Sequence, residues 1–317
     1  MEVDETKSKG DFWLTGSQQY QMMKGITESL AGRVAIINLL GFSQKERYRV
    51  PKQSIPFLAG ATPFLRQEYA TDIHQLYADI WTGSFPVTIV EETLDTRLFY
   101  NSYLQTYLQR DIRELSQVGN LDYFTRFVKA CAARTGQLLN YSNLARDVDI
   151  SVNTAKNWLS LLVSSFQVFL LPPYHSNLTK RLIKTPKLYF MDTGLCAFLT
   201  EWTSAQPLQA GAMSGAILET FAITEILKSW WFHGEHPQLY YYRDKDGHEI
   251  DLLIVRDHTI YPIEIKRGAT VRHSWVRHFS LLDRFKMQRG EGAVICLNDR
   301  VQYIDSKNKA VPIGAIG

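Results

Sequence analysis

Charged residues interrupt two apolar segments near the C-terminus, and this pattern limits what the last third of the chain can fold into. Residues 249–255 and 260–266 are rich in Leu, Ile and Val, which is typical of buried strands. Yet the first segment contains Asp251, and the second contains Glu264 and Lys266. Alternate side chains of a strand share a face. Because a short turn joins the segments, we expect Asp251 and Glu264 to converge at one end of a sheet, with Lys266 beside them.

The elements predicted around these residues follow a definite order. Asp246-Gly247 is a strong hairpin signal before the first charged strand, and Glu219 lies on an amphipathic helix that precedes the sheet. The predicted elements are a helix over 215–231, strands over 239–243, 249–255 and 260–266, a helix over 275–285 and a buried strand over 293–297. The predicted order is therefore αβββαβ.

Two carboxylates and a lysine among apolar strands are costly to bury unless another group compensates their charge. A divalent cation such as Mg²⁺ would do so, because carboxylate oxygens are its preferred protein ligands. We predict Glu219, Asp251 and Glu264 as metal ligands. The cation would activate a water molecule, which Lys266 would orient, or Lys266 would stabilise the developing charge. These four residues are the predicted catalytic set, and the alternative is a structural ion-pair cluster at the end of the sheet.

A compact helical unit precedes this region. It is predicted to contain helices over 123–133, 142–147 and 152–163, followed by strands over 166–171 and 187–191. Ser151 is placed as the N-cap of the third helix. This order of elements is typical of a winged helix-turn-helix.

Basic and amide side chains gather on the third helix of this unit and between its two strands. Asn and Thr side chains can read base edges, and Lys can neutralise phosphates. The predicted nucleic-acid contacts are Asn153, Lys156, Lys180, Arg181, Lys184 and Lys187. DNA is the predicted partner, and the alternative is a basic loop on a helical spacer that contacts a protein.

The N-terminal part reads as strand, helix and strand over 12–15, 18–30 and 33–40. The apolar run 33–40 suits a strand buried on both faces of a parallel sheet. Two short strands cannot make such a sheet alone, so we expect the chain to begin partway through a domain. Residues 63–115 read as mainly helical and polar, with a turn at 83–86.

Composition adds few constraints. The chain has 317 residues, a formal net charge of +3 and 45% hydrophobic residues, so its overall charge favours no particular partner. Three widely spaced cysteines suit a reducing compartment and argue against a disulfide scaffold or a CxxC metal site. No stretch approaches the roughly 20 apolar residues of a membrane-crossing helix. We expect a cytoplasmic protein without a membrane partner, and the residues leave the oligomeric state open.

Several blocks of sequence resemble one family. Residues 12–18 (FWLTGSQ) and 28–33 (ESLAGR) are similar to the final part of the AAA+ ATPase module of a large prokaryotic family. Residues 103–112 (YLQTYLQRDI) resemble the start of its C-terminal region of unknown function. Residues 180–184 (KRLIK) and 187–195 (KLYFMDTGL) continue that region. The resemblance covers nearly the whole chain.

The resemblance also implies functional residues. The αβββαβ tail with Asp251, Glu264 and Lys266 resembles the PD-(D/E)XK nuclease superfamily, which includes members that bind without cutting. Ser17 would lie near the sensor-1 position of an ATPase, and Arg33 would contact nucleotide or a neighbouring subunit. The chain contains no GxxxxGK[ST] loop to hold phosphates. The resemblance therefore implies an N-terminally truncated member, in which ATP is a cofactor of the full-length family and is not bound tightly.

The predicted fold class is α/β and α+β multidomain. The predicted parts are a remnant of an AAA+ α/β module over 1–60, a helical linker over 61–120, a winged helix-turn-helix over 121–195 and a PD-(D/E)XK nuclease-like core over 205–317. The leading hypothesis is a truncated AAA+ family protein with a DNA-related role. The alternatives are an active Mg²⁺-dependent DNA endonuclease and a non-catalytic protein-interaction module.

Overall fold

The computed structural model describes residues 35, 37–50, 55–60, 72–91, 93–108, 121–175 and 185–316. From residue 37 onward the chain forms one compact unit. The residues predicted for nucleotide contact, Ser17 and Arg33, lie outside the described residues. The same holds for three residues of the predicted basic loop, Lys180, Arg181 and Lys184.

Short helices dominate the first described part, as the sequence predicts. They are α3 (Gln44–Arg47), α4 (Ile73–Thr82), α5 (Pro86–Val90), α6 (Thr96–Tyr103) and the π-helix η2 (Leu104–Leu108). Asp72 caps α4 by accepting backbone N–H groups of its first turn. Gly83 forms the predicted turn between α4 and α5 with a φ of +81°, and a Cβ there would collide with Tyr100 and Asp192. Only glycine therefore suits this turn.

The apolar run 33–40 does not form the predicted strand in its described part, Ala35 and residues 37–40. A strand needs a neighbour to receive its backbone hydrogen bonds, and no described strand pairs with this segment. Ile37 and Leu39 are 64% and 84% exposed, so they are not buried on both faces.

The middle part contains the predicted helices and strands in the predicted order. Its elements are α8 (Leu121–Ala132), β1 (Gln137–Leu138), α9 (Tyr141–Val148), α10 (Val152–Ser164), β2 (Val168–Leu171) and β3 (Lys187–Phe190). Ser151 caps α10, because its side chain accepts the N–H of Thr154. The strands form an antiparallel sheet in the order β1-β3-β2. Two further helices, α12 (Thr193–Leu199) and α13 (Ala205–Ala210), follow and were not predicted.

The last part begins with α14 (Ser214–Trp231) and continues into a large sheet. Its strands are β4 (Gln238–Arg243), β5 (Glu249–Arg256), β6 (Thr259–Ile265), β7 (Gln288–Arg289), β8 (Gly292–Cys296), β9 (Gln302–Tyr303) and β10 (Asn308–Pro312). The order is β4-β5-β6-β8-β10-β9, with β7 beside β6. β4 to β6 pair antiparallel, whereas β6-β8 and β8-β10 pair parallel. The described chain is thus a mixed α/β structure, as predicted, and its large sheet contains both parallel and antiparallel pairs.

Two expectations about helices in this part are wrong. The segment 275–285 forms two 3₁₀ helices, η3 (His273–Val276) and η4 (Phe279–Arg284), instead of one α-helix. Its buried residues Val276, Phe279 and Leu282 recur every third position, which matches the three residues per turn of a 3₁₀ helix. A last 3₁₀ turn, η5 (Ile313–Ala315), follows β10.

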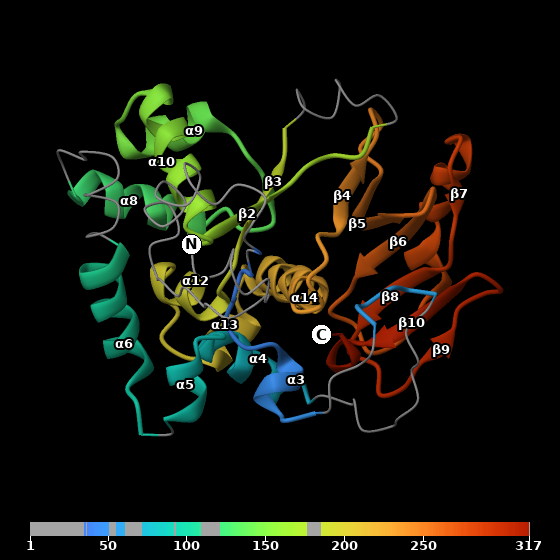
Figure 1. The fold of residues 1–317 in the computed structure, drawn as a ribbon, viewed down its shortest axis with the longest axis horizontal. Helices are drawn as coiled ribbons and strands as arrows, with labels where there is room; N and C mark the ends of the chain where they lie inside the picture. Colours follow the sequence, from blue (N-terminus) through green and yellow to red (C-terminus); the bar gives the residue numbers. More distant parts are fainter. Residues whose placement is uncertain are drawn as a thin grey trace, which may run out of the picture. The chain divides into compact units, whose positions relative to one another are not determined.

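The helix α14 is not amphipathic, because it is buried on nearly every side. Figure 1 shows it in the centre, between the helices of the first two parts and the sheet. It contacts α4, α12 and α13 as well as β6. Both faces of the sheet are covered, one by the core that includes α14 and the other by the core that includes η3 and η4. No helix within the described part of the chain is long and apolar enough to cross a membrane.

Candidate functional site: a carboxylate and lysine cluster

Asp251, Glu264 and Lys266 lie together at one end of β5 and β6. The two strands pair antiparallel with Leu252 opposite Ile263. The backbone N–H of Ile265 donates to Oδ2 of Asp251 at 2.8 Å. The ammonium of Lys266 lies 2.5 Å from Oε1 of Glu264 and 3.7 Å from Oδ2 of Asp251. The structure thus brings together the three residues that the strand pattern selects.

Glu219 joins this cluster from α14 through two residues of β3. Its Oε1 accepts hydrogen bonds from Lys187 Nζ at 3.0 Å and from the Tyr189 hydroxyl at 2.5 Å. Lys187 also pairs with Oε1 of Glu249 at 2.5 Å. The charge of Asp251 acts on both Glu219 and Lys187. The four carboxyl groups and two lysines therefore form one electrostatic cluster, and the Tyr189 hydroxyl joins it through Glu219. We call these side chains the carboxylate cluster: Glu219, Glu249, Asp251, Glu264, Lys187, Tyr189 and Lys266.

Lys187 is buried, although its predicted role requires an exposed side chain. The sequence places it on an exposed basic edge that contacts nucleic acid, but its side chain is only 5% exposed. Its ammonium is paired with Glu219 and Glu249. The reason is that Lys187 and Tyr189 of β3 direct their side chains toward Glu219 of α14 and not toward solvent.

Burial and crowding change the protonation of the cluster. Burial, followed by the charge of Asp251, raises the pKa of Glu219 to about 7 and that of Glu264 to about 8. Burial alone would lower the pKa of Lys187, but Glu219 and Glu249 outweigh it and raise the pKa. Because Glu219 and Glu264 are protonated part of the time near neutral pH, the charges of the remaining carboxylates, the two lysines and Arg243, which lies 3.7 Å from Glu249, come close to balance. The cluster nevertheless gathers four carboxyl groups, each of which offers oxygen atoms.

The three predicted metal ligands are neighbours but do not form a closed ligand set. Among the described residues, only Asp244, Asp246 and His248 place three candidate ligand atoms within 4.8 Å of one another. They lie in the predicted turn between β4 and β5, where His248 contacts Asp244 at 3.0 Å. Glu219, Asp251 and Glu264 are spread more widely, with the lysine ammoniums among them.

Two members of the cluster were missed as site residues, and a distortion of the sheet lies beside them. Glu249 stands two positions before Asp251 on the same strand, which is a signal that strand alternation provides. Tyr189 follows Lys187 by two positions on β3, but its role depends on packing against α14. The pairing of β4 with β5 shifts register between Tyr240 and Tyr242. Such shifts re-aim side chains, and alternation alone does not reveal them.

The predicted nucleic-acid contacts on α10 lie on an exposed face. Asn153 and Lys156 are exposed, and the ammonium of Lys156 lies 5.8 Å from the centre of the Tyr141 ring. The opposite face of α10 is buried through Trp158, whose ring packs edge-on against Phe124 and Phe127. α10 thus has one face fixed in the core and one polar face available.

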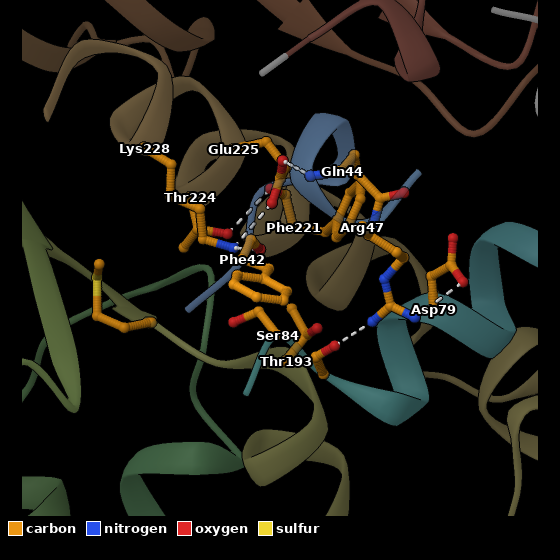
Figure 2. A pocket seen from close by; sticks show the side chains of 12 residues that line it. Phe42, Gln44, Arg47, Asp79, Ser84, Thr193, Phe221, Thr224, Glu225 and Lys228 are labelled. Carbon is orange, nitrogen blue, oxygen red and sulfur yellow. Dashed lines mark hydrogen bonds and ion pairs between the residues drawn. The ribbon is translucent and has the colours of Figure 1, made fainter. Parts of the chain in front are cut away.

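A second polar region lies where the segment before α4 meets α14. Figure 2 shows a small pocket there, lined by residues of both segments, among them Gln44 and Glu225. Oε2 of Glu225 accepts the N–H of Gln44 at 2.8 Å, and Lys228 donates to Oε1 of Glu225 and to the carbonyl of Phe42, both at 2.9 Å. The local sequence pattern does not indicate the buried Glu225–Lys228 pair.

A further contact fixes the same segment to α4. The guanidinium of Arg47 lies 3.3 Å from Oδ1 of Asp79, and the hydroxyl of Tyr48 donates to Oδ2 of Asp79 at 2.6 Å. Figure 2 shows Arg47 directed toward Asp79 across the pocket from Glu225. The segment 42–48 is thus held by two helices through charged side chains.

Three family models match successive parts of the chain. Residues 2–48 match an AAA domain, residues 73–206 match a domain of unknown function (DUF8612), and residues 214–316 match another domain of unknown function (DUF4143). The carboxylate cluster draws on the last two matches, because Lys187 and Tyr189 fall in one and its other members fall in the next. The segment 42–48 is the end of the AAA match.

Two curated relatives, uncharacterised proteins of Mycobacterium bovis and Mycobacterium tuberculosis, are each 27% identical to the chain over 284 residues. The matched region covers 89% of this chain and 58% of each relative, so the chain spans little more than half of their length. No solved structure matches. The AAA match at residues 2–48 and the two domain matches after it show the predicted similarity: this chain is akin to AAA-type ATPase proteins with C-terminal domains of unknown function.

Proposed function

We propose that the carboxylate cluster binds a divalent cation and hydrolyses phosphodiester bonds in DNA, within a protein of the AAA-type family. The observation that carries this proposal is the convergence of Asp251, Glu264 and Lys266 at the end of two apolar strands. Removing so many charged groups from water is unfavourable unless their charge is balanced. The gathered carboxyl groups supply oxygen atoms, which are the ligands of a hard divalent cation, and a bound cation would favour their ionised forms.

The protein groups would share the chemistry as follows. Asp251 and Glu264 would hold the cation, with Glu219 as a third ligand from α14. A bound divalent cation would supply an activated water molecule and would neutralise charge on the phosphate. Lys266 already contacts both Asp251 and Glu264, so its ammonium is placed to orient the attacking water or to stabilise the charge that develops on the phosphate oxygens.

The middle part of the chain would position the nucleic acid. Its three helices and three-stranded antiparallel sheet have the composition of a winged helix-turn-helix. In that interpretation α10 is the recognition helix and presents Asn153 and Lys156 from its exposed face. Lys180, Arg181 and Lys184 would add phosphate contacts from the segment between β2 and β3.

The ATPase part of the proposal concerns the whole protein. Residues 2–48 match an AAA domain, and Ser17 and Arg33 fall within that match. In a protein of the relatives' length, we propose that these two residues contact nucleotide and that ATP turnover acts on the DNA-processing domains. ATP is not proposed as a ligand of this chain alone.

A non-catalytic module that docks a protein partner is the second candidate. One specific observation favours it: lysines already pair with the carboxylates, and Glu219, Asp251 and Glu264 do not bring their ligand atoms within 4.8 Å of one another. In this reading the cluster only locks α14, β3 and β5 together. It would then bind no metal.

Cleavage of DNA by the full chain separates the two candidates. With Mg²⁺ or Mn²⁺ we expect nicking of plasmid DNA, and Asp251→Asn should abolish it, because the amide keeps the hydrogen bond from Ile265 but loses the charge that holds the cation. Asp257→Asn is the matched control, since the Asp257 side chain is 93% exposed at the end of the same strand. Equal cleavage by the Asp251→Asn and wild-type proteins would remove the catalytic reading and leave the docking module.

A further inference from the structure

Two side chains of the carboxylate cluster come from the domain that precedes it. Lys187 and Tyr189 alternate on β3, so they lie on one face of that strand. Both contact the same oxygen, Oε1 of Glu219. Within the described part of the chain no hydrogen bond is assigned to the other oxygen, Oε2. Glu219 is therefore held by β3 through one oxygen, and its second oxygen is not engaged by Lys187 or Tyr189.

Lys187 has the surroundings of a permanent internal cation. Its ammonium lies between Glu219 at 3.0 Å and Glu249 at 2.5 Å, and its side chain is 5% exposed. The ring of Tyr241 lies beside it, with its centre 5.7 Å from Nζ. Asp251 also acts on it electrostatically. A lysine in such a site stays charged, because the carboxylates of Glu219 and Glu249 stabilise its ammonium at close range.

We infer that Lys187 is a built-in counter-ion that occupies the Glu219–Glu249 side of the cluster and thereby weakens and limits divalent-cation binding there. This inference rests on the proposed metal-binding function. Lys187 stands where a cation between Glu219 and Glu249 would stand, so a metal can use only the opposite side, with Asp251, Glu264 and Oε2 of Glu219. The preceding domain, through β3, thus sets the metal affinity of the cluster.

The electrostatics fix the direction of the effect. Replacing Lys187 by methionine keeps most of the length of the side chain but removes one positive charge next to two carboxylates. The cluster then gains negative charge, and a divalent cation is attracted more strongly at such short range. Lys187 is a positioning residue in this scheme, because it acts on Glu219 and does not contact the substrate.

Manganese binding by the full chain tests the inference without DNA. We expect Lys187→Met to bind Mn²⁺ about tenfold more tightly than the wild type in calorimetric titration at one pH. Its melting temperature should also rise more on addition of Mn²⁺. Lys129→Met is the matched control, since Lys129 forms an exposed pair with Glu201, and it should leave Mn²⁺ affinity unchanged. A folded Lys187→Met protein with wild-type or weaker affinity overturns the inference.

A second variant covers a loss of folding in Lys187→Met. Glu249→Gln leaves Lys187 in place with Glu219 as its remaining direct carboxylate partner, so the lysine should compete better and Mn²⁺ affinity should fall. Unchanged or higher affinity in that variant overturns the inference. Recovery of folded Lys187→Met on addition of Mn²⁺, judged by circular dichroism, supports it.

Cleavage assays on the same variants separate this inference from the proposed function. Tighter Mn²⁺ binding by Lys187→Met without DNA cleavage by any variant would support the counter-ion role and reject the nuclease. Cleavage by the wild type with no gain of affinity in Lys187→Met would reject the counter-ion role alone. Absence of Mn²⁺ binding in every variant would overturn both.

Discussion

Lys45 shows, at the scale of one residue, a charge that the fold buries without a hydrogen-bond partner among the described residues. Lys45 is 7% exposed, and no described residue accepts a hydrogen bond from its ammonium. Burial lowers the pKa of Lys45 to about 8, although the carboxylate of Glu225 partly offsets this. Between about 8 and the ordinary value of 10.5, the unfolded chain holds a proton that the folded chain has released. Stability therefore rises with pH across this window, and the penalty is complete below about 8.

Replacing Lys45 by methionine should stabilise the protein. The change keeps the buried stem and removes the unpaired charge, so we expect a gain of about 1–3 kcal/mol at pH 7. The gain should shrink as the pH rises from about 8 toward 10.5. Chemical denaturation at pH 7 and pH 9.5 measures both effects, with Lys245→Met at an exposed position as the control. A loss of stability at pH 7 would show that the ammonium has a stabilising partner.

Strand alternation was enough to predict part of the candidate site from individual residues. Asp251, Glu264 and Lys266 converge because the turn between β5 and β6 is short and the register follows from it. Lys187 could not be placed in this way, because its surroundings come from α14 and β5, which are distant in sequence. Packing between segments that are distant in sequence buries Lys187, which the local sequence places in an exposed basic region.

At the scale of elements, prediction succeeded where local chemistry decides the structure. Ser151 begins α10 because its own side chain accepts the backbone N–H of Thr154. The prediction of one α-helix near residues 273–284 failed, because the apolar spacing of this segment fits 3₁₀ helices. The prediction that α14 is amphipathic failed, because Glu225 and Lys228 are polar in sequence but pair with each other inside the protein.

The exposed face of α10 leads to a prediction about DNA. Lys156 is exposed on the helix that the winged-helix interpretation assigns to recognition, so Lys156→Glu should weaken DNA binding and lower the slope of log affinity against log salt by about 1. Gel-shift titrations between low and moderate salt measure this. Lys286→Glu, an exposed lysine in the last part of the chain, is the control. Equal losses in both variants would mean that only overall charge matters.

At the scale of the whole described molecule, α14 connects two polar regions. Glu219 takes part in the carboxylate cluster, and Glu225 and Lys228, further along the same helix, hold the segment 42–48. That segment is the end of the AAA match. A helix transmits displacement along its axis because its backbone hydrogen bonds keep it rigid. The end of the AAA match and the carboxylate cluster are thus attached to one structural element.

Breaking the Glu225–Lys228 pair should release this attachment. Glu225→Gln leaves the ammonium of Lys228, whose side chain is 3% exposed, without its carboxylate, so we expect a loss of about 3–5 kcal/mol of stability. Trypsin should then cleave faster after Arg47, because the loss of the charged pair weakens one of the two anchors of the segment. Glu201→Gln, in an exposed pair, should change neither. Adding Lys228→Met to Glu225→Gln should recover much of the stability, since no unpaired charge remains, but not the protection from trypsin, since Phe42 has lost its donor. Full protection in the double variant would mean that Arg47 and Asp79 hold the segment alone.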